Sequence, residues 1–217
     1  MAVVSDDALV LDALPFRDRH QLVSILTRRH GVVRGVLRGA RGGKAPRRAA
    51  TEILSLVHCT YHQGAQAELA TVRTIEIETS SYPLACDLDR VAAAAVVAEL
   101  LLTFCPPSEP ATVAFRLGRS LLHALLEGAP PRTVVAYAQL WVLWIAGLMP
   151  DMDAMTAAAA GLEPDDLSFL ALCRRTPPEA ILERPPAGLA AWLDRRSREE
   201  AERHLKALDF FVAHRGA

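Results

Sequence analysis

Residues 21–40, QLVSILTRRHGVVRGVLRGA, contain the pattern that decides the fold of the first part of this chain. Two runs rich in Val, Ile and Leu flank a polar segment, which is typical of two strands joined by a turn. In the second run, Val33 and Leu37 alternate with Arg34 and Arg38, and successive side chains of a strand point to opposite faces. The pattern therefore predicts a strand that displays both arginines on one face of a sheet.

Three further stretches with strand character lie on either side of this segment. They are residues 8–14 (ALVLDAL), 53–61 (ILSLVHCTY) and 68–78 (ELATVRTIEIE), each rich in strand-forming residues and bounded by turn formers. Five short strands within residues 7–77 predict a small β-barrel or sandwich. In the last stretch, period two places these residues on one face: Leu69, Thr71, Arg73, Ile75 and Ile77.

Beyond residue 80 the hydrophobic period changes to that of a helix. Helices are predicted over residues 90–105, 111–127, 133–147 and 164–173, and a C-terminal helix is predicted from Leu189 with a break near Ser197. Asp87 or Asp89 is expected to cap the first of them. The order of the elements predicts an α+β chain in which a β module precedes an α-helical module.

The predicted helices also carry expectations about faces and pairs. The helix at 111–127 is expected to bury Val113, Leu117, Leu121 and Leu125, to expose Arg116, Ser120, His123 and Glu127, and to end at Gly128. In the C-terminal helix the spacing predicts a capping box of Ser197 with Glu200, and ion pairs of Glu199 with Arg203 and of Glu202 with Lys206.

One apolar stretch, VVAYAQLWVLWIAGLMP at residues 134–150, raises the question of a membrane span. It is at the lower length limit for crossing a bilayer, contains Gln139 and lacks a flanking basic cluster, so we expect a buried helix instead. Asp6 and Asp7 stand where a secretory signal needs basic residues, and the four cysteines are widely spaced. Both features predict a cytoplasmic protein in a reducing compartment.

The charge is distributed unevenly along a chain whose net charge is only −1. Residues 1–80 carry 11 basic and 8 acidic side chains, whereas residues 81–217 carry 13 basic and 17 acidic ones. Within residues 17–50 ten basic residues face the single acid Asp18. Such an asymmetry predicts a polyanion-binding site on the first part of the chain.

Nucleic acid is the polyanion that this pattern favours, because lysine and arginine bind backbone phosphates whatever the base sequence. The module offers few aromatic rings for base stacking, mainly Phe16 and Tyr61, so binding is expected to be electrostatic and indifferent to sequence. The alternative is a solvated basic loop without a ligand. The candidate DNA-binding residues are Arg28, Arg29, Arg34, Arg38, Arg41, Lys44, Arg47 and Arg48.

The sequence contains no pattern that predicts catalysis or a resident metal. No C-x-x-C pair is present, and His58 and His62 are too far apart on a strand to share one ion. The spacings of a serine hydrolase elbow and of a P-loop are absent as well. We therefore expect a protein that is not an enzyme and has no cofactor.

Two segments at this separation make the chain similar to the RecO family of bacterial DNA repair proteins. The first is LVSILTRRHGVVRGVLRGARG at residues 22–42, and the second is YAQLWVLWIAGLMPDMDAM at residues 137–155, which contains the family's G-L-x-P ending. The positions that match the first family motif are Leu26, Thr27, Gly31, Arg38, Gly39, Ala40 and Arg41.

The resemblance implies an N-terminal five-stranded OB-fold-like β-barrel that binds DNA, over residues 1–80, and an α-helical domain that binds partners, over residues 81–217. It implies a recombination mediator that binds single- and double-stranded DNA and anneals complementary strands. Together with RecR, such a protein helps to load RecA onto strands coated by single-stranded DNA-binding protein, and it works at the nucleoid. The acidic, hydrophobic C-terminal tail of that coat protein docks on the helical domain, for which Arg116, Arg119 and Arg132 are candidates, unless these are only solvent-facing charges.

The chain departs from the family pattern in three places. Many members carry four zinc-binding cysteines after the G-x-x-P segment, whereas DMDAMTAAAAGL at residues 151–162 has none, so we expect no zinc. Residues 156–187 are short and rich in Ala and Pro, and His20 stands where an acid is common. The competing functional class is a non-catalytic interaction scaffold with an incidental basic loop, and a less favoured one is a nucleic-acid-processing enzyme.

Overall fold

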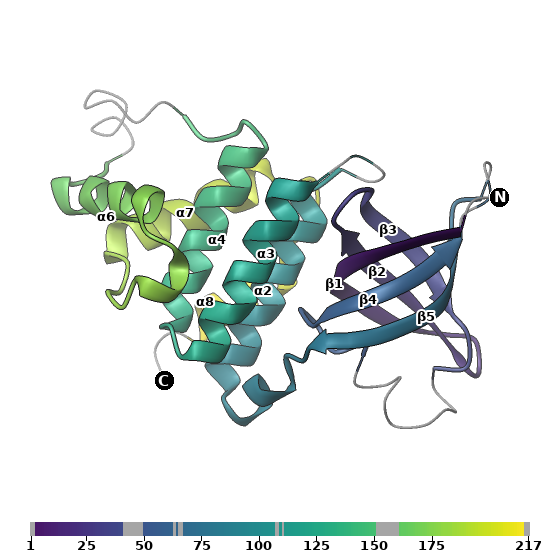
Figure 1. The fold of residues 1–217 in the computed structure, drawn as a ribbon. Helices are drawn as coiled ribbons and strands as arrows, with labels where there is room; N and C mark the ends of the chain where they lie inside the picture. The colour runs from purple at the N-terminus through teal and green to yellow at the C-terminus, as the bar shows by residue number, and fades with distance from the viewer. Residues whose placement is uncertain are drawn as a thin grey trace.

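The computed structural model describes residues 3–40, 50–62, 64, 67–106, 109, 111–150 and 161–214. Five strands form one sheet that closes on itself, in the order β1-β2-β3-β5-β4 (Figure 1). Neighbouring strands are antiparallel except β3 and β5, which are parallel. The predicted N-terminal OB-fold-like barrel is confirmed. Its strands are β1 Val3–Phe16, β2 His20–Thr27, β3 Gly31–Leu37, β4 Leu56–His62 and β5 Ala70–Thr79.

The helices that follow lie together on one side of the barrel (Figure 1). Asp87 caps the first of them by accepting a hydrogen bond from the backbone N–H of Arg90, and Gly128 ends α3 with φ +97°. Both features match the sequence prediction. The elements are η1 Tyr82–Cys86, α2 Leu88–Phe104, α3 Thr112–Glu127, α4 Pro131–Ile145, α6 Pro164–Arg175, η2 Pro178–Ala180, α7 Ala187–Glu200 and α8 Lys206–Ala213.

Strand β1 is apolar on both sides because it serves two cores. Ala8 and Val10 point into the barrel, whereas Leu9 and Leu11 point outward into the core formed with the helices. Leu26 and Val32 of β2 and β3 join that second core. The run ALVL in β1 is therefore continuous rather than alternating, because each side of the strand is covered by packed side chains.

The barrel and the helices meet at close range. Gly118 lets α3 approach β1, since a Cβ atom there would lie 2.5 Å from a methyl carbon of Leu9. Gly31 has φ +64°, and a Cβ atom there would overlap the backbone carbonyl of Glu109, 2.1 Å away. The hydroxyl of Thr112 also donates to the carbonyl of Arg28 at 3.2 Å. These contacts hold α3 and the segment before it against β1 and against the β2–β3 turn.

Two polar side chains within the apolar helices, Glu99 and Gln139, form hydrogen bonds with distant parts of the chain. Glu99, the interior charge of α2, accepts hydrogen bonds from the backbone N–H groups of Ala207 and Leu208 and so caps α8. Gln139 is fully buried in α4 and donates to Asp194 at 2.9 Å. The segment 134–150 thus contains a buried helix, as expected. No helix in the described part of the chain has the length and apolarity that a membrane span needs.

Two predicted boundaries are wrong. Strand β4 begins at Leu56 rather than at Ile53, because Leu54 adopts φ +66°, which an extended strand does not permit. The C-terminal break lies at residues 201–205 and not near Ser197, which is buried within α7. The predicted capping box at Ser197 is therefore wrong.

Three predictions about side-chain faces and pairs also fail. Val113 is 50% exposed although Leu117, Leu121 and Leu125 are buried as expected. The predicted ion pairs at 199–203 and 202–206 cannot form as helical pairs because the chain is not helical at 201–205. The pairs observed there are Arg196–Glu200, Arg198–Asp209 and His204–Asp209.

Candidate nucleic-acid interface

The outer face of β3 is divided between a covered and an uncovered part. Val32 is buried under the helices, whereas Arg34, two residues further on the same face, is exposed. Val36 is half-buried, and Arg38, just beyond the strand, is exposed. The predicted alternation is confirmed, and the Cα atoms of the two arginines are separated by about 13 Å along the extended chain.

A second arginine-bearing strand lies beside this face. Thr71 of β5 pairs with Val36 of β3 on one side and with His62 of β4 on the other. Arg38 and Arg73 line one open hollow together with His62 and Thr71. The closed barrel thus places Arg38, after β3, and Arg73, on β5, on one outer surface.

Arg73 was not among the predicted site residues, and the structure explains why. Strict alternation would place Arg73 on the same face as Ile75. In the structure, however, Thr60 of β4 pairs with Thr74 and the next residue, Tyr61, pairs with Val72, so that Arg73 has no partner on β4. Arg73 is the extra residue of this bulge, so it is exposed while Ile75 and Val72 both enter the barrel core. Ile77 is 40% exposed. The predicted common face of β5 is wrong, and no local sequence signal marks the bulge.

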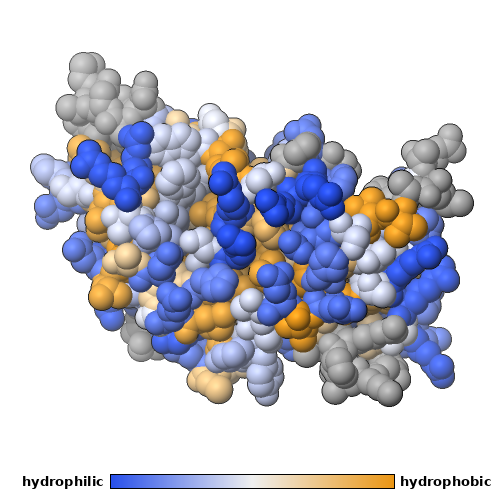
Figure 2. Space-filling view, in the orientation of Figure 1, coloured by the Kyte–Doolittle hydropathy of each residue, from blue (hydrophilic) through white to orange (hydrophobic). Residues whose placement is uncertain are grey.

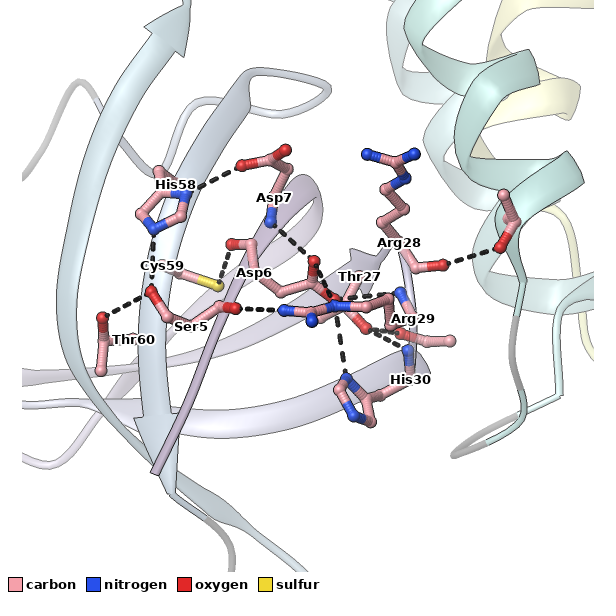
Figure 3. A network of polar contacts seen from close by, with 12 residues as sticks. Ser5, Asp6, Asp7, Thr27, Arg28, Arg29, His30, His58, Cys59 and Thr60 are labelled. Atoms are coloured by element: carbon pink, nitrogen blue, oxygen red, sulfur yellow. Dashed lines mark hydrogen bonds and ion pairs between the residues drawn. The ribbon is translucent and has the colours of Figure 1, made fainter. Parts of the chain in front are cut away.

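The β2–β3 turn uses its two arginines differently. Arg29 forms an ion pair with Asp6, its Nε atom lying 3.2 Å from Oδ1, and its backbone N–H donates to the other carboxylate oxygen (Figure 3). The side chain of Asp6 is only 4% exposed, and its Oδ2 atom also lies 3.6 Å from Nδ1 of His30. Arg29 therefore anchors the turn to β1, although its side chain remains 62% exposed. Arg28 projects out of this network on the side that faces the helices (Figure 3).

The remaining predicted residues divide into two groups. Arg41, Lys44, Arg47 and Arg48 lie outside the described residues. On the helices, Arg116 and Arg119 line a hollow with Arg28, whereas Arg132 lines a different hollow with Arg184 at the start of α4. The structure thus places Arg116 and Arg119 beside Arg28 of the barrel, whereas Arg132 lies in a separate hollow.

Strands β1 and β4 carry a hydrogen-bond relay that sequence reasoning missed. Ser5 Oγ lies 2.8 Å from Nε2 of His58, and Nδ1 of His58 lies 2.8 Å from Asp7 Oδ1 (Figure 3). The connectivity is that of a serine hydrolase triad. Its members, however, lie on the outer face of the β1–β4 ladder, where Ser5 pairs with Thr60. Asp7 lines the hollow with Arg28, but Ser5 and His58 do not.

Three of the cysteines are buried and kept in the thiol form. Burial raises the pKa of Cys59, Cys105 and Cys173 to about 12, and the charges of Asp6 and Asp7 add to this effect at Cys59. A thiol of such a pKa is a poor nucleophile at neutral pH. Within the described ranges, no cluster of three His, Cys, Asp or Glu side chains could hold a metal ion.

Sequence comparisons agree with this architecture. The family profile described as Recombination protein O N terminal matches residues 1–81, and the profile described as Recombination protein O C terminal matches residues 86–209. This chain belongs to the RecO family. A DNA repair protein RecO from Koribacter versatilis is 31% identical over 163 residues, which cover 75% of this chain and 66% of the relative.

Other relatives of the RecO family show similar coverage. DNA repair protein RecO from Rhodospirillum rubrum is 31% identical over 170 residues, covering 76% of this chain and 66% of the relative. The protein of the same name from Desulforamulus reducens is 26% identical over 169 residues, covering 78% and 65%. The chain thus matches just under two thirds of the length of these curated relatives.

Proposed function

We propose that this RecO-family chain binds DNA strands by their phosphate backbone on the uncovered outer face of its barrel. The observation that carries the proposal is the exposure of Arg34 on β3, Arg38 just beyond its end and Arg73 on the neighbouring β5, with Arg38 and Arg73 lining one hollow. None of these guanidinium groups has an ion pair or hydrogen bond within the described ranges. Arginine binds phosphate oxygens bidentately. The proposal also assigns DNA binding to Arg41, Lys44, Arg47 and Arg48, on the ground of their charge alone.

Binding on this face is independent of base sequence. The side chains between the arginines are Val36 and Thr71, which offer no aromatic platform, and Tyr61 is only 2% exposed inside the barrel. Without base stacking, affinity depends on charge and on the release of condensed cations. Cationic side chains lower the repulsion between two strands, so complementary strands anneal faster while base pairing supplies the driving force.

The wider role that we propose is that of a recombination mediator in DNA repair, acting with RecR to load RecA on strands coated by single-stranded DNA-binding protein. In this role the helical part docks the acidic, hydrophobic tail of the coat protein. The hollow that contains Arg132 supports such contact, because Arg184 adds a second cation against the one carboxylate of Asp89, and Phe211 and two prolines add apolar surface. A tail of mixed acidic and apolar character matches this lining.

The proposed role requires no catalysis. The high pKa of the three buried thiols supports a non-catalytic protein, because thiols of such a pKa are poor nucleophiles. The hydrogen bonds of His58 serve instead to link β1 and β4. Incubation of DNA with the protein and divalent metal ions is expected to give no cleavage products.

A salt titration of single-strand binding tests the proposal. If about five phosphates are engaged, log affinity should fall with log salt with a slope of roughly −3.5. The variant Arg34→Glu/Arg38→Glu should bind at least tenfold more weakly, with a slope smaller in magnitude by about 1.4. The matched control Arg195→Glu/Arg203→Glu changes two exposed arginines of the helical part and should bind within twofold of the wild type.

If the chain is instead an interaction scaffold, the same measurements of single-strand binding should give different results. A scaffold with an incidental basic loop would show no binding at low ionic strength, or binding that survives concentrated salt. It would also show equal affinities for the two charge-reversed variants. Any of these results overturns the proposal.

A further inference from the structure

The β2–β3 turn and helix α3 meet in a hollow that lies apart from the arginines of β3 and β5. Arg28 comes from the turn, and Arg116 and Arg119 come from α3. Phe115 and Leu56 form the apolar part of its lining. Two groups of arginines that the sequence assigned to different partners, DNA and protein, therefore share one site at the junction of barrel and helices.

The three guanidinium groups in this hollow form no ion pairs with described residues. No ion pair or hydrogen bond in the described part of the chain engages any of them. Asp7 and Glu78 line the same hollow, but Asp7 is already bonded to His58 at 2.8 Å. Three cations and two carboxylates leave an excess of positive charge.

Helix α3 carries an energetic cost at this site. Arg116 and Arg119 are three residues apart, so they lie on one face about 4.5 Å apart along the helix axis and repel each other. Neither forms an ion pair in the described part of the chain, although Glu127 and Glu179 line the adjacent hollow with both of them. A local cost without an evident structural gain is typical of a binding surface. Figure 2 shows hydrophilic side chains gathered over α3 and the adjoining end of the barrel.

The site is held rigidly relative to the barrel. The hydrogen bond from Thr112 to the Arg28 carbonyl and the close approach of Gly118 to Leu9 join the two sides of the hollow. A buried core that includes Leu26 and Val32 continues beneath the junction. The separation between the hollow and the outer face of β3 is therefore set by packed side chains rather than by a linker.

We propose that the hollow formed by Arg28, Arg116 and Arg119 binds the phosphate backbone of a second nucleic-acid strand while the first strand occupies the face of β3 and β5. This inference rests on the proposed function. One chain then holds two strands at a separation fixed by its core. The adjacent hollow along α3 contains the same two arginines together with Ser120, His123, Glu127 and Glu179, and Ser120 donates a hydrogen bond to Glu179 at 3.4 Å.

A bridging experiment tests the second site. Two oligothymidylates, one with a donor dye and one with an acceptor dye, cannot pair with each other, so energy transfer between them requires that the protein holds both. Wild-type protein is expected to give transfer, and Arg116→Glu/Arg119→Glu is expected to lose most of it. The same variant should anneal complementary strands at least tenfold more slowly, while its affinity for one strand changes less than threefold.

Controls separate this inference from its alternatives. Arg116→Lys/Arg119→Lys keeps the charge and should retain bridging, and Arg195→Glu/Arg203→Glu should behave as wild type. Unfolding in urea checks that the exposed substitutions leave the fold intact. Unchanged bridging and annealing in the Arg116→Glu/Arg119→Glu variant overturns the second site, and so does a selective loss of binding to an acidic peptide. Failure of the wild type to bind even one strand would instead overturn the proposed function itself.

Discussion

Val32 and Arg34 lie on the same outer face of β3, yet the helices bury the first and leave the second exposed. The covered part of the barrel surface is apolar, whereas the uncovered part carries arginines. Burying a Val or Leu side chain stabilises a fold by about 1.5–3 kcal/mol. This gain is obtained only where the helices cover the barrel, so apolar residues are favoured there and not on the uncovered face. The comparison teaches that the helices define the binding face by what they leave uncovered.

The covered region should dominate stability. Leu9→Ala removes a fully buried side chain between β1 and α3 and should lower the free energy of unfolding by about 3 kcal/mol. Gly118→Ala places a methyl group against the same side chain, so the double variant should lose less than the sum of the two single changes. Urea denaturation measures each effect.

The same experiment tests the division into residues 1–80 and 81–217. The three tryptophans lie on helices and report the helical part, whereas Cys59 is buried in the barrel and reports its opening through thiol labelling. Because the junction core is shared, we expect both probes to show one transition. Two separate transitions would contradict a shared core. So would a loss of unfolding free energy in the surface control Leu14→Ala as large as that in Leu9→Ala.

The uncovered region should control affinity rather than stability. Arg38→Gln and Arg73→Gln each remove one phosphate contact and should weaken single-strand binding about fivefold, close to 1 kcal/mol. Fluorescence anisotropy at fixed salt gives both values. An effect of Arg38→Gln without one of Arg73→Gln would exclude the bulged strand from the interface, and Arg195→Gln serves as the neutral reference.

Buried thiols in both regions should make stability depend on alkaline pH. The pKa of Cys59 in the barrel and of Cys105 and Cys173 in the helical part is raised from 9.0 to about 12 by burial. The unfolded thiols ionise first, so this contribution to stability is complete below pH 9 and is lost as the pH rises from 9 to 12. Urea midpoints across this range should fall, and Cys59→Ala should make the fall shallower.

The smallest effect is expected at the relay on β1 and β4. Ser5→Ala removes a partly solvated hydrogen bond and should change stability by less than about 1 kcal/mol, with no change in DNA affinity. A fluorophosphonate probe should leave Ser5 unlabelled. Labelling that disappears in the Ser5→Ala variant would show an activated nucleophile and a catalytic function.

Local sequence patterns determined much of the fold. Alternation in β3 predicted the exposure of Arg34 and Arg38, and the cap at Asp87 and the left-handed Gly128 marked the bounds of helices. These features depend on the backbone period and on hydrogen bonds between near neighbours, so they can be read from adjacent residues. The run ALVL in β1 predicted a strand, but not that its two sides serve different cores.

The interface itself required the tertiary structure. Arg73 reaches the surface through a bulge whose register is set by β4, and Arg28 meets Arg116 because Gly118 lets α3 pack on Leu9. Likewise, Asp6 engages Arg29 only after β1 and the β2–β3 turn are adjacent. The sequence by itself determined which segments are strands and helices and where positive charge accumulates. Only the packed structure decided which charges are paired and which remain available, because long-range contacts bring distant residues together.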